Sequence, residues 1–234
     1  MMEWWQILLI VLGSLLFLFI LSIIFYKPFF KRFWDIVLSG IAIIVLSPIL
    51  LILSLLGLIF MKGNPFFTQE RPGKKDKNGQ ERIFKLVKFR TMSNKKDDFG
   101  NLLPDELRLN KYGIFLRSTS MDELPELFNI FIGNMSIVGP RPLLVKYLDR
   151  YTPYQRRRQE VRPGLTGLAM STIRNSLGWE KKFELDVKYV DELSFFLDIK
   201  IIFWTIKIVL KREGINEPGN ATNSEFLGTK EDIK

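Results

Sequence analysis

The sequence predicts an α/β protein, mainly helical with a small β-sheet, that is attached to a membrane through its N-terminal part. Two uncharged apolar stretches occupy residues 4–26 and 36–61. The remainder is charged, with near-alternating segments typical of short strands and longer segments typical of helices. The chain therefore divides into a spanning helix (1–28), a second membrane segment (29–62), a cytoplasmic domain (63–213) and a flexible tail (214–234).

Composition restricts the chemistry. The 234 residues include no cysteine and no histidine, which excludes disulfides, thiolate zinc sites and catalytic triads with an imidazole base. Metal ligands must then come mainly from carboxylates, and such oxygen ligands suit Mg²⁺ or Mn²⁺. The formal net charge is +9. No nucleic-acid motif accompanies this charge, so we interpret it as favouring anionic membrane lipid over nucleic acid.

The first apolar stretch is long enough to cross a hydrocarbon core of roughly 30 Å. Trp4 and Trp5 stand at its start, and tryptophans commonly mark the membrane interface. No positively charged segment precedes the stretch and no small-residue cleavage site follows it. We therefore expect a spanning helix rather than a cleaved signal peptide.

The second apolar stretch contains Ser47-Pro48 near its middle, where proline predicts a break or kink. If this stretch spanned the membrane, the basic loop at 27–32 would lie opposite the basic segment that follows Lys62. The positive-inside rule favours the cytoplasm for both. A re-entrant helix, which enters the inner leaflet, bends at Pro48 and returns, satisfies the rule. A kinked spanning helix remains the alternative.

In the charged domain we expect strands at residues 65–69 and 82–89, joined by a polar turn. Helices are expected at residues 120–131, 143–160 and 178–192. The amphipathic segment 195–212 suits either the lipid head-group plane or packing against the core, and the sequence leaves both open.

Asp122 and Glu123 are the most informative residues, because two adjacent carboxylates in a basic chain need cations nearby. Ser120 and Glu123 also match a capping box, which would make the pair structural. Adjacent helical residues diverge by about 100°, so one carboxylate could cap while the other points elsewhere. A helix N-terminus is also a natural phosphate seat, which would bring a phosphorus atom close to Asp122. The residues alone leave both interpretations open.

Three further motifs supply candidate phosphate-binding groups. Lys88, in the Lys-Phe-Arg-Thr-Met motif at 88–92, stands at an expected strand end. Arg141, in the Gly-Pro-Arg-Pro motif, lies between two prolines that restrict its backbone, which suits bidentate phosphate binding. The Arg-Pro-Gly-Leu-Thr-Gly motif at 162–167 has two glycines that let a backbone approach a ligand. In isolation the Gly-Pro-Arg-Pro motif is better explained as a turn with a solvated arginine, and the 162–167 motif is simply a turn. The 88–92 motif is a plausible anion site.

Taken in order, these motifs resemble those of the bacterial sugar transferase family, the monotopic phosphoglycosyltransferases that act on polyprenyl phosphate. The resemblance runs from about Phe30 to Arg212. It is carried by Ser47-Pro48 and by residues 68–73, 88–92, 117–125, 128–129, 133–142 and 162–167.

The resemblance implies a magnesium-dependent transfer of a sugar-1-phosphate from a UDP-sugar to undecaprenyl phosphate, with release of UMP. The reaction would take place at the cytoplasmic face of the bacterial inner membrane, as the first membrane step of glycan or glycoconjugate assembly. By the same resemblance Asp122 is the nucleophile, which forms a covalent phosphosugar intermediate, and Glu123 is its metal-binding or acid–base partner. Both are thus candidate Mg²⁺ ligands. The implied phosphate-binding residues are Arg117, Arg141 and Arg174, with Lys88 as a further candidate.

The chain departs from the family pattern after the 162–167 motif. Where members commonly have Gly-Trp-Ala-Gln-Val-x-Gly-Arg, Leu168, Met170 and Ile173 replace the Trp, the Gln and the second Gly. Asn134 replaces the usual Asp. The replacements at residues 168–173 put in doubt the contacts that this loop makes with the donor in the family, and we make no prediction of the sugar.

Two alternatives of other classes remain. One is a non-catalytic membrane-surface module of a glycan-assembly complex, in which Asp122 and Glu123 only cap a helix. The other is a magnesium phosphohydrolase, which would release sugar phosphate into solution. The sequence also leaves open whether the chain forms a homo-oligomer.

Overall fold

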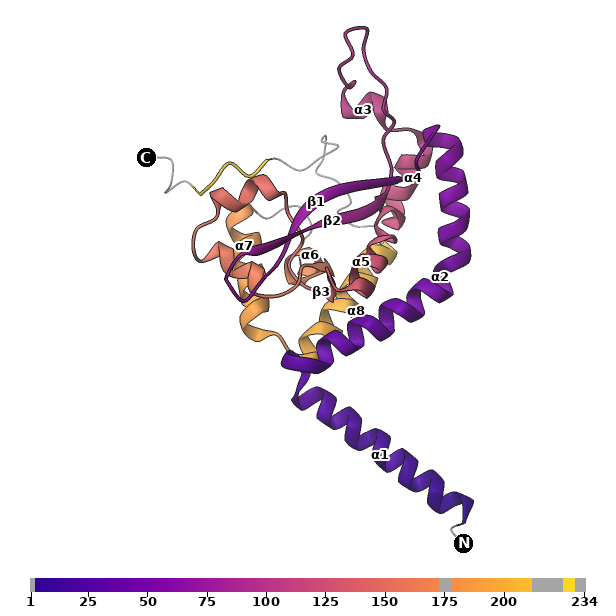
Figure 1. Cartoon of the computed structure of the whole chain (residues 1–234), viewed down its shortest axis with the longest axis vertical. Helices are drawn as coiled ribbons and strands as arrows, with labels where there is room; N and C mark the ends of the chain where they lie inside the picture. The colour runs from indigo at the N-terminus through magenta and orange to yellow at the C-terminus, as the bar shows by residue number, and fades with distance from the viewer. Residues whose placement is uncertain (1–2, 173–177, 212–224, 230–234) are drawn as a thin grey trace.

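The computed structural model describes residues 3–172, 178–211 and 225–229. Within these residues the fold is mainly helical with two small sheets, as predicted (Figure 1). The α-helices are α1 (Trp4–Ile24), α2 (Lys31–Met61), α3 (Asp105–Arg108), α4 (Lys111–Thr119), α5 (Glu126–Ile132), α6 (Leu168–Thr172), α7 (Trp179–Glu192) and α8 (Phe195–Lys211). The strands are β1 (Phe66–Lys75), β2 (Glu81–Phe89), β3 (Ser136–Val138) and β4 (Gly164–Thr166). The other helical segments are a π-helix, η1 (Tyr26–Phe30), and the 3₁₀-helices η2 (Met121–Glu123), η3 (Val145–Arg150) and η4 (Gln155–Glu160).

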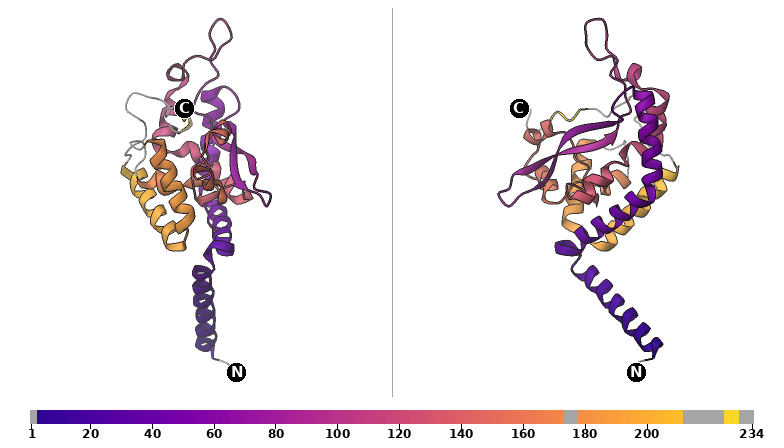
Figure 2. Two further views of the ribbon diagram at one scale, coloured as in Figure 1. Left: turned by 90° about the vertical axis from the view of Figure 1, so that its left-hand side faces the viewer. Right: turned by 45° about the vertical axis from the view of Figure 1, so that its right-hand side comes forward.

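Helix α1 extends away from the rest of the chain (Figures 1 and 2). Most of its side chains are apolar, and nearly all are exposed. A helix of 21 residues is about 32 Å long at 1.5 Å per residue. By length and composition, α1 and α2 could each cross a membrane.

Helix α2 is continuous through Pro48 but bends near its middle (Figure 1). Proline has no N–H to donate to the carbonyl four residues earlier, which is that of Ile44. The hydroxyl of Ser47 donates to this carbonyl instead, at 2.8 Å. The predicted break or kink is therefore observed as a bend inside one continuous helix.

Both ends of α2 contact the same domain. Near its start, Arg32 donates to the carbonyls of Ile130 and Phe131 at the end of α5, at 2.6 and 2.8 Å. Near its other end, the hydroxyl of Tyr112 in α4 donates to the carbonyl of Leu53 at 2.7 Å. The apolar core at this second end consists of Leu50, Leu53, Met61, Phe89, Tyr112 and Leu116.

The two sheets determine where the sequence motifs lie in the fold. β1 and β2 form the predicted antiparallel hairpin, and Lys88 lies at the end of β2. β3 pairs in parallel with β4 and so brings the Gly-Pro-Arg-Pro motif beside the 162–167 motif. A Cβ on Gly139 or Gly164 would overlap backbone atoms of the other segment. These glycines therefore allow two backbones to approach each other.

Two predicted helices are interrupted. The helix expected at 120–131 is observed as η2 followed by α5, with Pro125 between them. The helix expected at 143–160 is observed as η3 and η4, with Pro153 between them. Proline in a helix interior removes a backbone hydrogen bond and clashes with the preceding turn. The helix expected at 178–192 is confirmed as α7.

The described part of the predicted flexible tail, residues 225–229, packs against the domain. Phe226 is only 2% exposed. Its ring contacts those of Tyr147, Tyr151, Trp179 and Phe183. Burial of an aromatic ring favours docking, so residues 225–229 pack against the domain, and the flexible tail as a whole stays a prediction.

Candidate functional site

Asp122 and Glu123 lie in η2, a single 3₁₀ turn between α4 and α5. Ser120, at the start of this turn, is in the left-handed region with φ of 56°, and its side chain makes no capping hydrogen bond. The capping-box interpretation is therefore wrong. The Glu123 carboxylate is instead held by two cations.

Glu123 accepts two charged contacts on the same oxygen, Oε1. Lys88 Nζ lies 2.7 Å from it and Arg141 Nη2 lies 2.9 Å from it. Burial disfavours the charged carboxylate, but the charges of Lys88 and Arg141 outweigh this effect and lower the pKa of Glu123. Glu123 is therefore ionised at neutral pH and fixes the positions of both cations.

Asp122 differs from its neighbour. Among the described residues its carboxylate has neither a hydrogen-bond nor an ion-pair partner. Burial and the negative charge of Glu123 raise the pKa of Asp122 to about 6, against the opposing charges of Lys88, Arg141 and Arg117. At neutral pH Asp122 is thus largely ionised and uncommitted, as a carboxylate nucleophile must be.

Glu126, which the sequence analysis missed, belongs to the same cluster. It is 3% exposed, and its Oε1 lies 2.9 Å from Lys88 Nζ. Burial and the nearby charge of Glu123 raise the pKa of Glu126 to about 7. A sequence signal existed, because Glu126 lies one turn after Asp122 in the helix expected at 120–131. In the structure η2 and Pro125 interrupt that helix, and Glu126 joins the cluster through Lys88.

Glu126→Gln should change how stability depends on pH. A folded-state pKa of about 7, against an ordinary 4.5, means that ionising Glu126 lowers the stability of the wild type as pH rises through this window. The melting temperature of the variant minus that of the wild type should therefore increase between pH 4.5 and about 7.5, and level off above about 8. Measurements in detergent with a chelator present would exclude metal effects.

Glu81→Gln provides the matched control with the opposite sign. The hydrogen bond from Arg156 lowers the pKa of Glu81, so its carboxylate contributes stability that is present at higher pH and lost on acidification. The melting-temperature difference for this variant should decrease with rising pH below about pH 5, near the ordinary pKa of a glutamate, and stay flat across the window in which the Glu126→Gln difference increases. A Glu126→Gln difference that is flat, or that moves in the same direction as Glu81→Gln, would contradict the assignment.

The arginines near the carboxylate cluster differ in their burial and hydrogen bonding. Arg117, on α4, donates from Nε to the hydroxyl of Thr91 at 3.1 Å and lies close enough to affect Asp122. Arg71, also missed as a site residue, has its Nε buried without a hydrogen-bond partner in the described structure. Burial and the charge of Arg141 lower the pKa of Arg71 to about 10. The predicted residue Arg174 lies outside the described residues.

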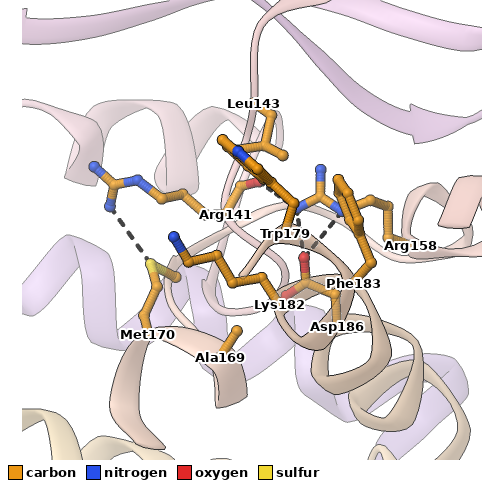
Figure 3. Close-up of a pocket in the computed structure, with 9 residues that line it drawn as sticks. All are labelled: Arg141, Leu143, Arg158, Ala169, Met170, Trp179, Lys182, Phe183 and Asp186. Carbon is orange, nitrogen blue, oxygen red and sulfur yellow. Dashed lines mark hydrogen bonds and ion pairs between the residues drawn. The ribbon is translucent and has the colours of Figure 1, made fainter. Parts of the chain in front are cut away.

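Arg141 also lines a pocket next to the carboxylate cluster (Figure 3). Its guanidinium is about half exposed, with 47% of the side-chain surface accessible, and its Nη1 lies 3.4 Å from the sulfur of Met170. Trp179 and Phe183 of α7 form the opposite side. Met170, one of the departures from the family pattern, is thus placed beside the predicted phosphate-binding arginine.

The structure therefore brings together Asp122, Glu123, Lys88 and Arg141, with Arg117 close by. One unpaired carboxylate lies beside several cations, and these could neutralise an anionic substrate. Within the described ranges no group of three carboxylates could hold a metal ion. Mg²⁺ is commonly bound by one or two carboxylates together with substrate phosphates. The Asp122–Glu123 pair fits such a site, which a phosphate-bearing substrate would complete.

Comparison with known proteins identifies the family of this chain. The model of the bacterial sugar transferase family matches residues 26–212. The chain is 46% identical over 200 residues to the uncharacterized sugar transferase EpsL of Bacillus subtilis, and the match covers 85% of this chain and 96% of that protein.

Two longer relatives have more specific names. One is the UDP-glucose:undecaprenyl-phosphate glucose-1-phosphate transferase of Klebsiella pneumoniae, 38% identical over 76% of this chain and 39% of its own length. The other is the undecaprenyl-phosphate galactose phosphotransferase of Salmonella typhimurium, 33% identical over 80% of this chain and 41% of its own length. This chain thus spans about two fifths of these longer relatives. With the family model matching most of its length, the chain belongs to the bacterial sugar transferase family.

Proposed function

We propose that this protein transfers a sugar-1-phosphate from a UDP-sugar to undecaprenyl phosphate through a covalent intermediate on Asp122, and releases UMP. The observation that carries the proposal is the unpaired Asp122 carboxylate beside Lys88, Arg141 and Arg117, in a chain of the sugar transferase family. The names of the two longer relatives specify the same acceptor lipid.

The reaction consists of two displacements at one phosphorus atom. First, a carboxylate oxygen of Asp122 bonds to the sugar-bearing phosphorus, and the bond from that phosphorus to the bridging oxygen breaks. The bridging oxygen leaves with UMP and keeps the electron pair. An oxygen of undecaprenyl phosphate then attacks the same phosphorus and displaces the carboxylate. Because the steps are separate, the donor and the lipid need not occupy the site together.

The cations make this attack feasible, because a negative carboxylate must approach a negative diphosphate. Arg141 is half exposed and presents a planar guanidinium that can bind phosphate oxygens. Glu123 holds Arg141 and Lys88 in place before the substrate arrives, so little reorganisation is needed during the reaction. Asp122 and Glu123 would also hold Mg²⁺, which would neutralise further phosphate charge.

The contacts of α2 support a re-entrant topology at the cytoplasmic face. Both ends of this 31-residue helix touch the same domain, through Arg32 at one end and Leu53 at the other. A helix that crossed the membrane would place these contacts on opposite sides of a hydrocarbon core of roughly 30 Å. The bend of α2 allows it to return to the surface from which it entered.

Helix α8 supports contact with lipid on the same side. Its exposed apolar residues recur every three or four positions and form one stripe: Phe196, Ile199, Phe203, Ile206 and Leu210. The opposite side buries Ile201 in the core. Such a stripe with lysines beside it suits a helix in the head-group plane of anionic lipid.

Cysteine labelling tests the topology, since the chain has no cysteine of its own. Lys27→Cys and Asn64→Cys, at exposed positions on either side of α2, should react with an impermeant maleimide from the same side of sealed inner-membrane vesicles. Glu3→Cys, at the far end of α1, should react from the other side and serves as the control. Labelling of Lys27→Cys and Asn64→Cys from opposite sides would show that α2 spans the membrane.

The proposed function itself is tested with purified protein, Mg²⁺, undecaprenyl phosphate and a panel of UDP-sugars. We expect at least one donor to yield UMP and a lipid-linked sugar diphosphate in equal amounts. Free sugar phosphate would indicate a phosphohydrolase. No turnover of any donor would favour the non-catalytic membrane module.

A further inference from the structure

The pocket next to the carboxylate cluster has three walls of different character (Figure 3). The loop after β3 contributes Arg141, α6 contributes Met170, and α7 contributes Trp179, Lys182 and Phe183. None of the α7 residues was a predicted site residue. The reaction as proposed assigns no role to this pocket.

Arg141 joins the pocket to the proposed nucleophile. Its Nη2 contacts Glu123 at 2.9 Å, whereas its Nη1 faces Met170 at 3.4 Å on the pocket side. A molecule bound in the pocket and a group bound beside Asp122 would therefore both contact the guanidinium of Arg141. This is the placement required for two linked parts of a single substrate.

The α7 wall presents an aromatic surface. Trp179 stacks on Phe183 with ring centroids 5.9 Å apart and 26° between the planes. Tyr147 and Phe226 also pack against the indole, which is partly buried and lines the pocket. A large, supported indole is well suited to stacking a planar ring, since base–aromatic stacking depends little on the identity of the base.

The charge of the pocket is positive. Its acidic residue, Asp186, is neutralised by Arg158 at 2.6 Å, and both side chains are buried. Lys182 lies over the Trp179 ring at 5.1 Å and has no ion-pair partner in the part of the chain described. With Arg141 it provides cations beside an aromatic wall. A flat ring that carries an anionic group is the ligand class that matches this combination.

We propose that this pocket binds the nucleoside monophosphate part of the donor, with the base on Trp179 and the adjacent phosphate between Lys182 and Arg141. The sugar-bearing phosphorus then lies on the far side of Arg141, toward Asp122. This inference rests on the proposed function, because that function supplies a nucleotide as the leaving group. It adds the residues that recognise the base.

Equilibrium dialysis of the full-length protein in detergent with UMP and with ribose 5-phosphate tests the pocket without requiring turnover. Ribose 5-phosphate retains a phosphorylated ribose but lacks the base. Trp179→Leu should weaken UMP binding about tenfold, as loss of a stacked base predicts, and leave ribose 5-phosphate unchanged. Trp179→Phe should keep most of the UMP affinity because it retains a ring. Lys182→Gln should weaken the binding of both ligands.

Lys181→Gln is the matched control, because Lys181 lies on the same helix but pairs with Glu184 at 2.6 Å. It should bind both ligands like the wild type. In turnover assays, Trp179→Leu should raise the KM for the UDP-sugar and not the KM for undecaprenyl phosphate. Melting temperatures identify any variant that fails to fold, and Lys182→Gln, a change at a partly buried position, tests the pocket even if Trp179→Leu does not fold.

The outcomes separate the two proposals. If the wild type binds UMP, Trp179→Leu weakens this binding and no sugar phosphate is transferred to the lipid, the pocket is upheld and the proposed function is overturned. Transfer that proceeds normally, with UMP binding unaffected by Trp179→Leu and Lys182→Gln, would overturn the pocket alone. If Trp179→Leu weakened the binding of UMP and of ribose 5-phosphate equally, this result would also overturn recognition of the base by the Trp179 ring.

Discussion

Asp122→Asn should abolish formation of the lipid-linked product. The amide is close in size to the carboxylate but is a far weaker nucleophile, so the covalent step has no substitute in a chain without Cys or His. Removal of a catalytic group that acts within such a site typically costs on the order of 10⁴-fold in kcat. The measurement is the initial rate of transfer from the UDP-sugar to undecaprenyl phosphate.

Asp149→Asn is the matched control, because Asp149 is exposed on η3 and takes no part in the cluster. Its rate should equal that of the wild type. The melting temperature of Asp122→Asn should not fall below that of the wild type at neutral pH, since Asp122 has no hydrogen-bond partner to lose in the described structure and the amide removes a carboxylate whose pKa is raised. Substantial product from Asp122→Asn would defeat the assignment.

Arg158→Met should lower the free energy of unfolding by about 3–5 kcal/mol, the typical cost of leaving a buried charge without its partner. Arg158 contacts Asp186 at 2.6 Å, and the two side chains are only 1% and 6% exposed. Its Nη2 also donates to the carbonyl of Arg141 at 2.7 Å. The substitution thus removes the link between η4, α7 and the loop that carries Arg141. Denaturant titration in detergent measures the loss.

The neighbouring pair Arg157–Asp191 provides a matched comparison. It joins the same two elements at 2.5 Å, but its side chains are 38% and 50% exposed. Arg157→Met should therefore cost less than about 1 kcal/mol. The double variant Arg158→Met, Asp186→Leu should recover most of the stability lost in Arg158→Met, because no unpaired charge remains. Equal losses for the two single variants would contradict this account of the buried pair.

Three residues that the sequence singled out as site candidates lie together in the structure. Lys88, Glu123 and Arg141 lie in motifs separated by tens of residues, and the structure joins them at 2.7 and 2.9 Å. The mainly helical fold and the bend of α2 at Pro48 were also predictable, because proline and hydrophobic length act locally. The catalytic roles of Asp122 and Glu123 and the four-part division of the chain stay predictions.

Features that depend on tertiary packing escaped the sequence analysis. Glu126 belongs to the cluster only because β2 brings Lys88 to the start of α5. Phe226 is buried because four aromatic rings from η3, its C-cap and α7 surround it. The capping box failed because Ser120 adopts a left-handed conformation that ends α4. A local motif does not report which of two competing hydrogen-bond patterns the fold selects.

Mass spectrometry of the protein incubated with Mg²⁺ and the UDP-sugar alone tests the central claim most directly. A donor that supports transfer should leave a sugar-phosphate adduct on the peptide that contains Asp122, and this adduct should disappear when undecaprenyl phosphate is added. Asp122→Asn should show no adduct. Transfer-competent protein that never carries such an adduct, at any time after donor addition, would contradict the two-step mechanism and the role of Asp122 as nucleophile.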